Sequence, residues 1–151
     1  MKEKMIGMEL VGTANALRRI TFQDGYDTKS EPDSPTSMQQ WFLSYIWEHY
    51  KSDTVVQKDL ETAFKIRRST ATEILKAMER KELIIRIPSS EDKRSKKIVL
   101  TDKAISICEK NQQKISQTEK KLVAGLSPKE IQQFFAILKK IQINIKNMDT
   151  F

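Results

Sequence analysis

Residues 54–101 constrain the fold of this chain most, because they predict two short helices followed at once by a two-stranded hairpin. Apolar residues recur at helical spacing in both helices, and so short a turn joins them that a helix-turn-helix is indicated. The apolar face of the second helix is made by Ala71, Leu75 and Met78. Two β-branched runs, 83–87 and 96–100, then flank a polar loop rich in turn-forming residues. The hairpin would form a wing beside the two helices.

The start of the second helix carries the residue types that read DNA. In a helix-turn-helix, the N-terminal residues of this helix reach base edges in the major groove. Arginine can pair two donors with guanine, short hydroxyls can bond a base or a phosphate, and exposed backbone amides favour a phosphate. The candidate DNA contacts here are Arg67, Arg68, Ser69, Thr70, Thr72 and Lys76. Arg67 puts positive charge at a helix N-terminus, so it is predicted to contact a phosphate that compensates this charge.

The hairpin supplies a second basic group, which would meet the DNA backbone or the adjacent minor groove. Its members are Lys93, Arg94, Lys96 and Lys97. Most basic runs merely solvate a surface, but here the helix spacing, the hydroxyl-rich helix start, the hairpin and the basic loop coincide. Residues 54–101 hold 12 Lys or Arg against 7 Asp or Glu, a net charge of +5, whereas residues 1–53 and 102–151 have nets of −2 and +4. The basic excess is greatest where phosphate neutralisation would supply affinity.

At these residues the chain resembles the MarR family of bacterial winged-helix regulators. The matching segments, in the family's order and at about its spacing, are 57–60, 68–72, 83–84, 92–94 and 100–103. The resemblance covers residues 36–148. It implies that Arg68, Ser69, Thr70 and Thr72 lie on the recognition helix, and that Arg94 is the wing arginine, steadied by Asp92. It also implies homodimers that form through the terminal helices.

Two departures from the family pattern fall at turns, where Lys65 and Glu82 stand in place of the usual glycines. Glycine enters the left-handed backbone region without steric cost. The sequence therefore predicts either strain of about 1 kcal/mol at each position or turns of a different geometry.

Four more helices are predicted outside the helix-turn-helix. Residues 5–22 form the first, with a narrow apolar stripe, and residues 23–36 form a polar, proline-containing loop. Ser37 and Gln40 resemble a capping box that opens an aromatic helix, which should be largely buried. Thr101 can cap a long helix that runs to about residue 123. The start of the last helix is marked by Ser127, Pro128 and Glu130.

The last helix carries an apolar seam at alternating steps of three and four, as in a coiled coil. Its residues are Ile131, Phe134, Leu138, Ile141, Ile145 and Met148. So small a domain cannot bury so long a stripe alone, which indicates a second subunit. The predicted fold class is therefore all-α with a small β-hairpin wing, in a single MarR-like chain spanning 1–151. Its winged helix-turn-helix would occupy 37–101, and 1–22 and 102–151 would form a helical dimerisation region.

The aromatic helix admits two interpretations. Its aromatic residues, Trp41, Phe42, Tyr45 and Trp47, are predicted to belong to the core. The resemblance, however, implies small effectors, often aromatic or lipophilic, that bind between the dimer helices and the DNA-binding region. If this chain has such a pocket, Trp41 and Tyr45 are its candidate residues.

No pattern in the chain supports catalysis, a metal site or a cofactor, so the protein is not expected to be an enzyme. The single histidine, His49, and the single cysteine, Cys108, cannot supply a Cys/His pair with a third orienting group. His49 is predicted to be a surface or capping residue, and Cys108 a small apolar residue, with a redox sensor as the alternative. No run approaches the ~20 apolar residues that span a bilayer, and the N-terminus lacks a secretory signal, so a cytoplasmic location is expected.

The sequence thus predicts a transcriptional repressor that binds a pseudo-palindromic operator in double-stranded DNA as a homodimer, and the resemblance implies that a small effector releases it. Two alternatives use the same winged helix. One is a nonspecific or architectural nucleic-acid-binding protein without effector control, and the other is a module for protein interaction.

Overall fold

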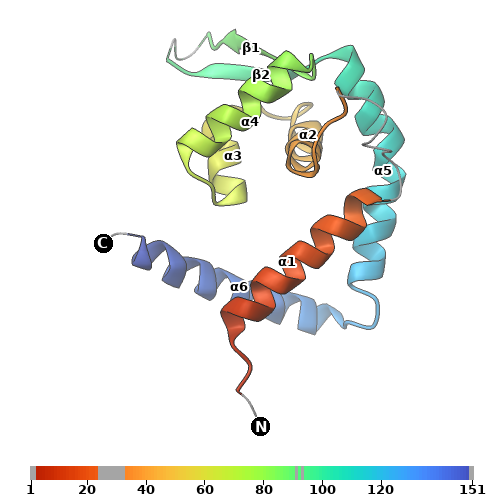
Figure 1. Cartoon of the computed structure of the whole chain (residues 1–151), viewed down its shortest axis with the longest axis vertical. Helices are drawn as coiled ribbons and strands as arrows, with labels where there is room; N and C mark the ends of the chain where they lie inside the picture. Colours follow the sequence, from red (N-terminus) through yellow and green to blue (C-terminus); the bar gives the residue numbers. More distant parts are fainter. Residues whose placement is uncertain (1–2, 24–32, 91, 93, 150–151) are drawn as a thin grey trace. The chain divides into compact units, whose positions relative to one another are not determined.

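A computed structural model describes residues 3–23, 33–90, 92 and 94–149, without the side chains of residues 21–23. The chain divides into two compact units, Met1–Gln113 and Lys114–Phe151. The elements are α1 (Ile6–Gln23), α2 (Ser37–His49), α3 (Gln57–Phe64), α4 (Arg68–Arg80), β1 (Ile84–Pro88), β2 (Lys96–Leu100), α5 (Asp102–Leu122) and α6 (Pro128–Met148) (Figure 1). This order confirms the predicted fold class, all-α with one small β-hairpin.

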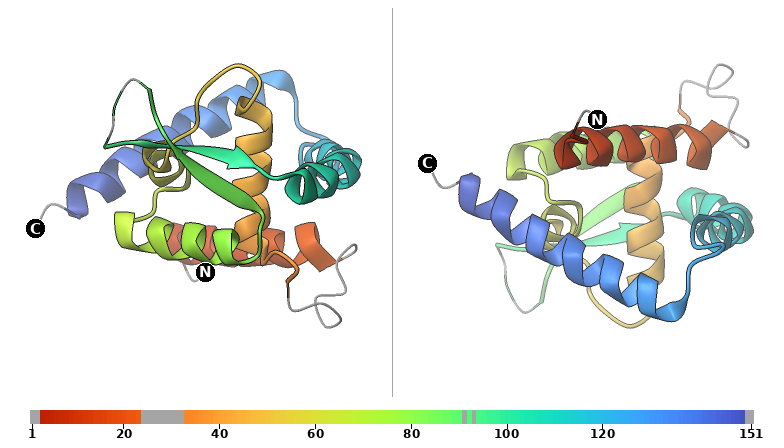
Figure 2. Two further views of the ribbon diagram at one scale, coloured as in Figure 1. Left: turned by 90° about the horizontal axis from the view of Figure 1, so that it is seen from above. Right: turned by 90° about the horizontal axis from the view of Figure 1, so that it is seen from below.

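The hydrophobic core of the first unit lies among α2, α3, α4, the hairpin and the first turns of α5. Its largest fully buried side chains include Phe42, Leu43, Ile46, Leu60, Leu75 and Met78. The strand β2 contacts α2 and α3, and β1 contacts α4, so that the hairpin lies against the helices (Figure 2). The helix-turn-helix and the wing therefore share one core and should keep their relative orientation.

The hairpin is antiparallel, with Ile84 opposite Leu100 and Pro88 opposite Lys96. The edge of β2 that faces away from β1 makes one more backbone hydrogen bond, in which the amide of Ile98 donates to the carbonyl of Val55 at 2.8 Å. The segment before α3 thus pairs with the wing, and this backbone bond ties the entry of the helix-turn-helix to β2.

The predicted capping box of α2 is wrong by one residue. The N-cap is Thr36, whose hydroxyl accepts from the amide of Gln39, while the Gln39 side chain accepts from the amide of Thr36 at 2.9 Å. The sequence offers two overlapping boxes with the same spacing, and local pattern cannot choose between them. Lys81 adds a bond to the Gln39 side chain at 2.9 Å, which favours the earlier box.

The predicted starts of the last two helices are confirmed. The hydroxyl of Thr101 accepts from the amide of Ala104 at 3.2 Å, at the start of α5. At the start of α6, the hydroxyl of Ser127 accepts from the amide of Glu130, and the Glu130 carboxylate accepts from the amide of Ser127 at 2.7 Å. Both helices therefore begin where side chains can satisfy the first backbone amides.

The two turns that lack glycine keep the left-handed geometry. Lys65 has φ 53° and Glu82 has φ 57°. The Lys65 turn closes α3, where the amides of Lys65 and Ile66 both donate to the carbonyl of Glu61. The turns therefore do not differ in geometry, and strain of about 1 kcal/mol at each position stays the prediction, because a Cβ at such φ crowds the backbone.

The aromatic helix α2 is fully buried along one face and half-buried along most of the rest. Phe42, Leu43 and Ile46 are buried, whereas Trp41 and Trp47 are half-buried. Of the residues of α2, only Glu48 is exposed, so the prediction of a largely buried helix is confirmed. Indole rings are large enough to cover the core edge with one side while the other meets solvent.

Candidate nucleic-acid interface

Helix α4, the predicted recognition helix, turns its apolar face inward and leaves its start in solvent. Ala71, Leu75 and Met78 are fully buried, as the spacing predicted. The residues around the first turn are exposed: Arg67, Arg68, Ser69 and Thr70. Since the buried face holds the helix in place, the helix start is presented outward on a rigid support.

The charge at the start of α4 suits an anion. Arg67 occupies the N-cap with φ −74° and ψ 154°, and its side chain makes no capping hydrogen bond to the helix. The first turn holds no acidic residue, and Arg68 begins the helix. Two guanidinium groups thus lie beside the positive end of the helix dipole. Positive charge there is unfavourable unless an anion binds near the helix start. A phosphate oxygen is the kind of ligand that satisfies this arrangement.

The hydroxyl of Thr72, another candidate contact, is engaged within the protein. It donates to the carbonyl of Arg68 at 2.8 Å and accepts from the side-chain amide of Gln57 at 2.9 Å. Gln57, the first residue of α3, belongs to the segment 57–60 that carries the family resemblance, but sequence analysis gave it no role. A polar side chain at the start of a short helix, next to its apolar face, was the pattern that could have indicated a contact with a neighbouring helix.

Lys76 lies one turn further along α4 and is exposed. Its ammonium is 3.5 Å from the carboxylate of Glu73, with both side chains more than half exposed. Such a surface pair contributes little stability, so Lys76 can exchange this partner for a phosphate.

The wing places most of its predicted basic residues at the surface. Arg94, Lys96 and Lys97 are exposed, while Lys93 lies outside the described residues. Asp92 accepts from the backbone amide of Arg94 at 2.9 Å. The support that Asp92 gives is therefore to the main chain of the turn, which sets where the Arg94 side chain begins.

An ion pair joins the wing to the recognition helix. Arg86 on β1 donates from Nε and Nη2 to the two carboxylate oxygens of Glu79 on α4, at 2.9 and 2.7 Å. These hydrogen bonds lower the pKa of Glu79 below its ordinary value and raise the pKa of Arg86. Sequence analysis missed this pair, although a lone arginine between isoleucines in a strand was a signal. Two parallel bonds fix direction as well as distance.

Lys81, the C-cap of α4, connects the other end of the recognition helix to α2. Its ammonium donates to the carbonyl of Ser34 at 2.8 Å and to the side-chain oxygen of Gln39 at 2.9 Å. Burial is the main cause that lowers the pKa of Lys81. No local pattern predicts these contacts, because Lys81 lies 42 positions from Gln39 and 47 positions from Ser34 along the chain.

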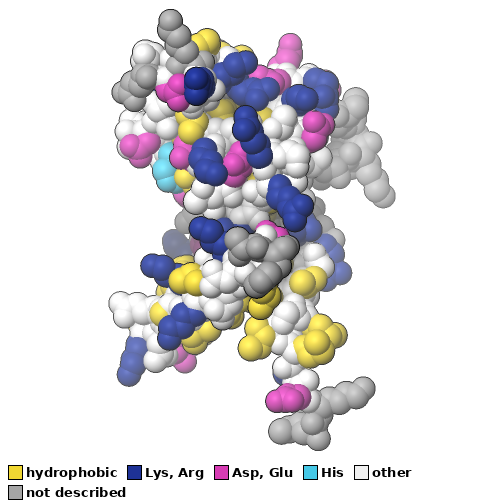
Figure 3. Space-filling view, turned by 90° about the vertical axis from the view of Figure 1, so that its left-hand side faces the viewer, with side chains coloured by type: hydrophobic (Ala, Val, Ile, Leu, Met, Phe, Trp, Pro, Cys, Tyr) yellow, Lys and Arg dark blue, Asp and Glu magenta, His cyan; other side chains and the backbone are white. Residues whose placement is uncertain are grey.

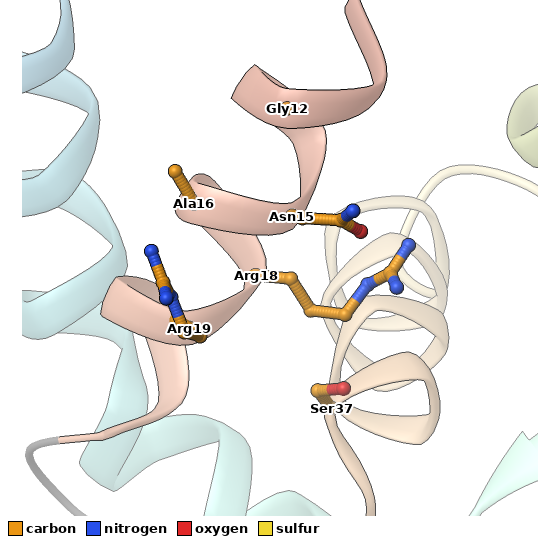
Figure 4. A pocket seen from close by; sticks show the side chains of 6 residues that line it. All are labelled: Gly12, Asn15, Ala16, Arg18, Arg19 and Ser37. Atoms are coloured by element: carbon orange, nitrogen blue, oxygen red, sulfur yellow. The ribbon is translucent and has the colours of Figure 1, made fainter. Parts of the chain in front are cut away.

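An open pocket of about 470 Å³ lies in the first unit, lined by α1 and the first residue of α2. Its lining residues are Gly12, Asn15, Ala16, Arg18, Arg19 and Ser37. Figure 4 shows Asn15 and Arg18 reaching from α1 toward α2. A volume of this size holds a small molecule, and two arginines favour one with an anionic group.

Neither of the predicted effector-pocket residues lines this pocket. Trp41 is half-buried and lies one helical turn beyond Ser37, on the same side of α2. Tyr45 packs against His49, with ring centroids 4.2 Å apart, and against the edge of Phe64. Burial, followed by the charges of Asp59 and Asp53, raises the pKa of Tyr45. These contacts favour a core role for Tyr45 and leave Trp41 as the better placed of the two.

The predicted dimerisation residues lie on α6, no residue of which is buried. Phe134 and Ile145 are each 55% exposed, while Ile131, Leu138 and Ile141 are half-buried. Three further apolar side chains outside the predicted seam are more than half exposed: Phe135, Ile137 and Ile143. Figure 3 shows hydrophobic side chains, in yellow, at the surface of the molecule, among Lys and Arg side chains in dark blue. The apolar surface of α6 is therefore wider than the seam.

The buried cysteine behaves as an apolar residue. Cys108 is 6% exposed, and burial raises the pKa of its thiol to about 11, so that it stays protonated near neutral pH. His49 bonds the carbonyl of Tyr45 at 2.8 Å, in the last turn of α2. Within the described ranges, no three His, Cys, Asp or Glu residues are grouped so that they could hold a metal ion. Nor is any helix there long and apolar enough to cross a membrane.

Comparison with known proteins connects this geometry to one family. The family model described as MarR family matches residues 38–96, which include α3, α4 and β1. The structure is similar to the transcription regulator MarR from Oenococcus oeni PSU-1, with 28% sequence identity and a TM-score of 0.77 over 91% of this chain and 98% of that one.

Two further similar structures contain DNA. One is the S. aureus MepR-DNA complex, at 26% identity and a TM-score of 0.78, covering 96% of this chain and 99% of that one. The other, a Listeria monocytogenes protein complexed with 26mer DNA, shares the fold at 23% identity and a TM-score of 0.75, over 96% and 91% of the two chains. The chain is therefore similar to the MarR family of transcription regulators, by the family model over residues 38–96 and by its winged helix-turn-helix fold over nearly its whole length.

Proposed function

We propose that this regulator binds double-stranded DNA through the start of α4 and through the wing. The observation that carries the proposal is the exposed, hydroxyl-rich and doubly cationic first turn of α4, held outward by a fully buried opposite face. An α-helix fits the major groove, and its first residues reach base edges there. MepR, a relative of the same fold, is described in complex with DNA, which supports the same use here.

The individual contacts follow from the position of each side chain. Arg68, Ser69 and Thr70 point from the helix start toward base edges, and Arg67 and Lys76 bind phosphates. On the wing, Arg94 with Lys96 and Lys97 meets the backbone or the adjacent minor groove, and Lys93 belongs to the same basic loop. Thr72 is assigned no direct contact with DNA, because its hydroxyl bonds Gln57 and the carbonyl of Arg68 within the protein.

The functional form is a homodimer. The wide apolar surface of α6 supports this, as do the exposed apolar residues of α1, where Ile6, Val11 and Ile20 are more than 60% exposed. A monomer that left this much apolar surface in water would tend to associate. Two α4 helices related by a twofold axis would lie roughly 34–36 Å apart and read a pseudo-palindrome with half-sites about 10 base pairs apart.

The dimer acts as a repressor, because a protein that covers a promoter palindrome excludes polymerase from it, and a small aromatic or lipophilic effector releases it. The pocket between α1 and the start of α2 supports an effector site, with Trp41 on the same side of α2 and Tyr45 a turn beyond it. An effector with a carboxylate would suit Arg18 and Arg19.

Selection of duplexes from a pool with randomised centres, followed by footprinting on the best one, tests the proposal. We expect a short protected palindrome. Arg68→Ala should weaken binding to it by about 1–3 kcal/mol and relax preference at one base step. Arg80→Ala is the matched control, since Arg80 is exposed at the opposite end of the same helix and should bind as the wild type does. Protection without sequence preference would indicate an architectural protein, and no protection an interaction module.

A further inference from the structure

The side chain of Gln57 bridges the starts of α3 and α4. Its Nε2 lies 2.9 Å from the hydroxyl of Thr72, 3.2 Å from the carbonyl of Arg68 and 3.1 Å from the carboxylate of Glu61. The first two acceptors belong to the first two turns of the recognition helix, and the third to α3 itself. One amide therefore connects the two helices of the helix-turn-helix at the end that faces DNA in the proposed function.

These bonds leave Thr72 without a hydrogen to donate. A hydroxyl has one hydrogen and two lone pairs. The hydrogen of Thr72 is directed to the carbonyl of Arg68 at 2.8 Å, and one lone pair accepts from Gln57. A phosphate oxygen, guanine O6 or thymine O4 all need a donor, so Thr72 can contact none of them while this arrangement holds.

We infer that Gln57 is a positioning residue for DNA recognition, and that Thr72 acts on DNA affinity through Gln57 rather than by a contact of its own. The inference rests on the proposed DNA binding of α4. Gln57 and Thr72 both bond the carbonyl of Arg68, and so hold the residue that begins the recognition helix. The apolar packing of Leu60 and Leu75 behind them is non-directional, whereas these hydrogen bonds set where the first turn of α4 lies.

A double-mutant cycle on DNA binding tests this inference. The variants are Gln57→Met, which keeps the length of the side chain but not its donors, Thr72→Val, which keeps the shape, and the combination of both. The probe is the duplex that wild-type protein selects from a randomised pool, at one salt concentration. We expect each single variant to bind it about fivefold more weakly, the effect of one ordinary hydrogen bond. The combined variant should be no weaker than either single one.

Thr62→Val is the matched control. Thr62 lies on α3, and its hydroxyl donates to the carbonyl of Lys58 at 2.9 Å, four residues earlier, as Thr72 donates to Arg68. It has no bond to the other helix among those of the described residues. Thr62→Val should therefore bind the selected duplex as the wild type does. An equal loss in this variant would overturn the inference, because it would show that any such hydroxyl matters.

Two further outcomes would also overturn it. If the losses from Gln57→Met and Thr72→Val add fully, Thr72 does not act through Gln57. If Thr72→Val relaxes preference at one base pair while Gln57→Met does not, Thr72 contacts that base directly. The same cycle measured on urea unfolding without DNA tests the bond in the protein alone. Wild-type protein that prefers no duplex would instead refute the proposed function, even with clear coupling in the unfolding cycle.

Discussion

Replacing Lys65 or Glu82 with glycine should stabilise this protein. Both residues have left-handed backbone, with φ 53° and 57°. This conformation costs a residue with a Cβ about 1–2 kcal/mol, and glycine avoids the cost. Glycine also has more freedom in the unfolded chain, which reduces the gain by about 0.4–1 kcal/mol. The expected net increase in the free energy of unfolding is therefore about 0.5–1 kcal/mol at each position.

Alanine at the same positions is the matched control, because it removes the same side chain but keeps the Cβ. At position 65, both substitutions lose the bond that the Lys65 ammonium donates to the carbonyl of Thr62 at 2.8 Å. At position 82, the carbonyl that accepts from the hydroxyl of Thr101 at 2.6 Å belongs to the backbone and remains in every variant. The difference between glycine and alanine thus isolates the backbone contribution, together with the freedom of the unfolded chain.

Urea unfolding followed by tryptophan fluorescence measures this difference. Both tryptophans, Trp41 and Trp47, lie on α2, in the same compact unit as the two turns. We expect the glycine variants to unfold at higher urea with an unchanged slope, and the two gains to add, since the turns lie at the ends of different helices. Glycine variants no more stable than the alanine variants would refute the argument that the turns are strained.

Four other outcomes are expected. Arg94→Ala should weaken binding to the selected duplex and lower the slope of log affinity against log salt by about one unit, while an unchanged affinity would remove the wing arginine from the interface. Because the Arg86 hydrogen bonds lower the pKa of Glu79, their stabilisation should be present above its ordinary pKa of 4.5 and be lost as pH falls through the lowered value. In Glu79→Gln, the free energy of unfolding should lack this loss as pH falls, which acid unfolding measures. Cys108, whose pKa is raised to about 11, should resist thiol reagents until the protein unfolds, and rapid labelling of folded protein would contradict its burial. Leu138→Asp would place a carboxylate in the proposed dimer interface and should yield monomers in sedimentation; a dimer that still protects the whole palindrome would place the interface elsewhere.

The parts of the fold that follow from residue spacing were predictable. The buried face of α4 is made by the three residues that helical spacing selected, Ala71, Leu75 and Met78. The hairpin appeared as two β-branched runs around a polar loop, because alternation and turn chemistry are local properties. The start of α2 was predicted one residue late, since two equivalent capping boxes overlap there and a contact from Lys81, far along the chain, favours one of them.

The polar contacts across the fold could not be predicted in the same way. Gln57 reaches Thr72 over 15 positions, and Lys81 reaches Gln39 over 42. Long polar side chains have many rotamers, and their partners are set by tertiary structure rather than by the residues beside them. For the same reason, the sequence placed Thr72 among the DNA contacts by its residue type, while the structure directs its hydroxyl to Arg68 and Gln57.

These contacts explain how so small a helix can be held in one orientation. Apolar packing buries one face of α4 but would tolerate rotation or sliding by a fraction of a turn, because dispersion and the hydrophobic effect have little direction. Three polar links restrict this motion at different points along the helix. Gln57 holds its start, the Glu79 pair with Arg86 ties its last turn to the wing, and Lys81 joins its end to α2.

The Lys81 link has a consequence for control by an effector. It bonds the Gln39 side chain that caps α2, and the pocket beside α1 is lined by Ser37, in the same first turn of α2. A molecule bound there that shifted this turn would act on the end of the recognition helix through one lysine. Lys81→Met should therefore reduce the effect of such a molecule on DNA affinity more than it reduces the affinity itself. If effector release were unchanged in Lys81→Met, the coupling would have to run through α5 or the dimer interface instead.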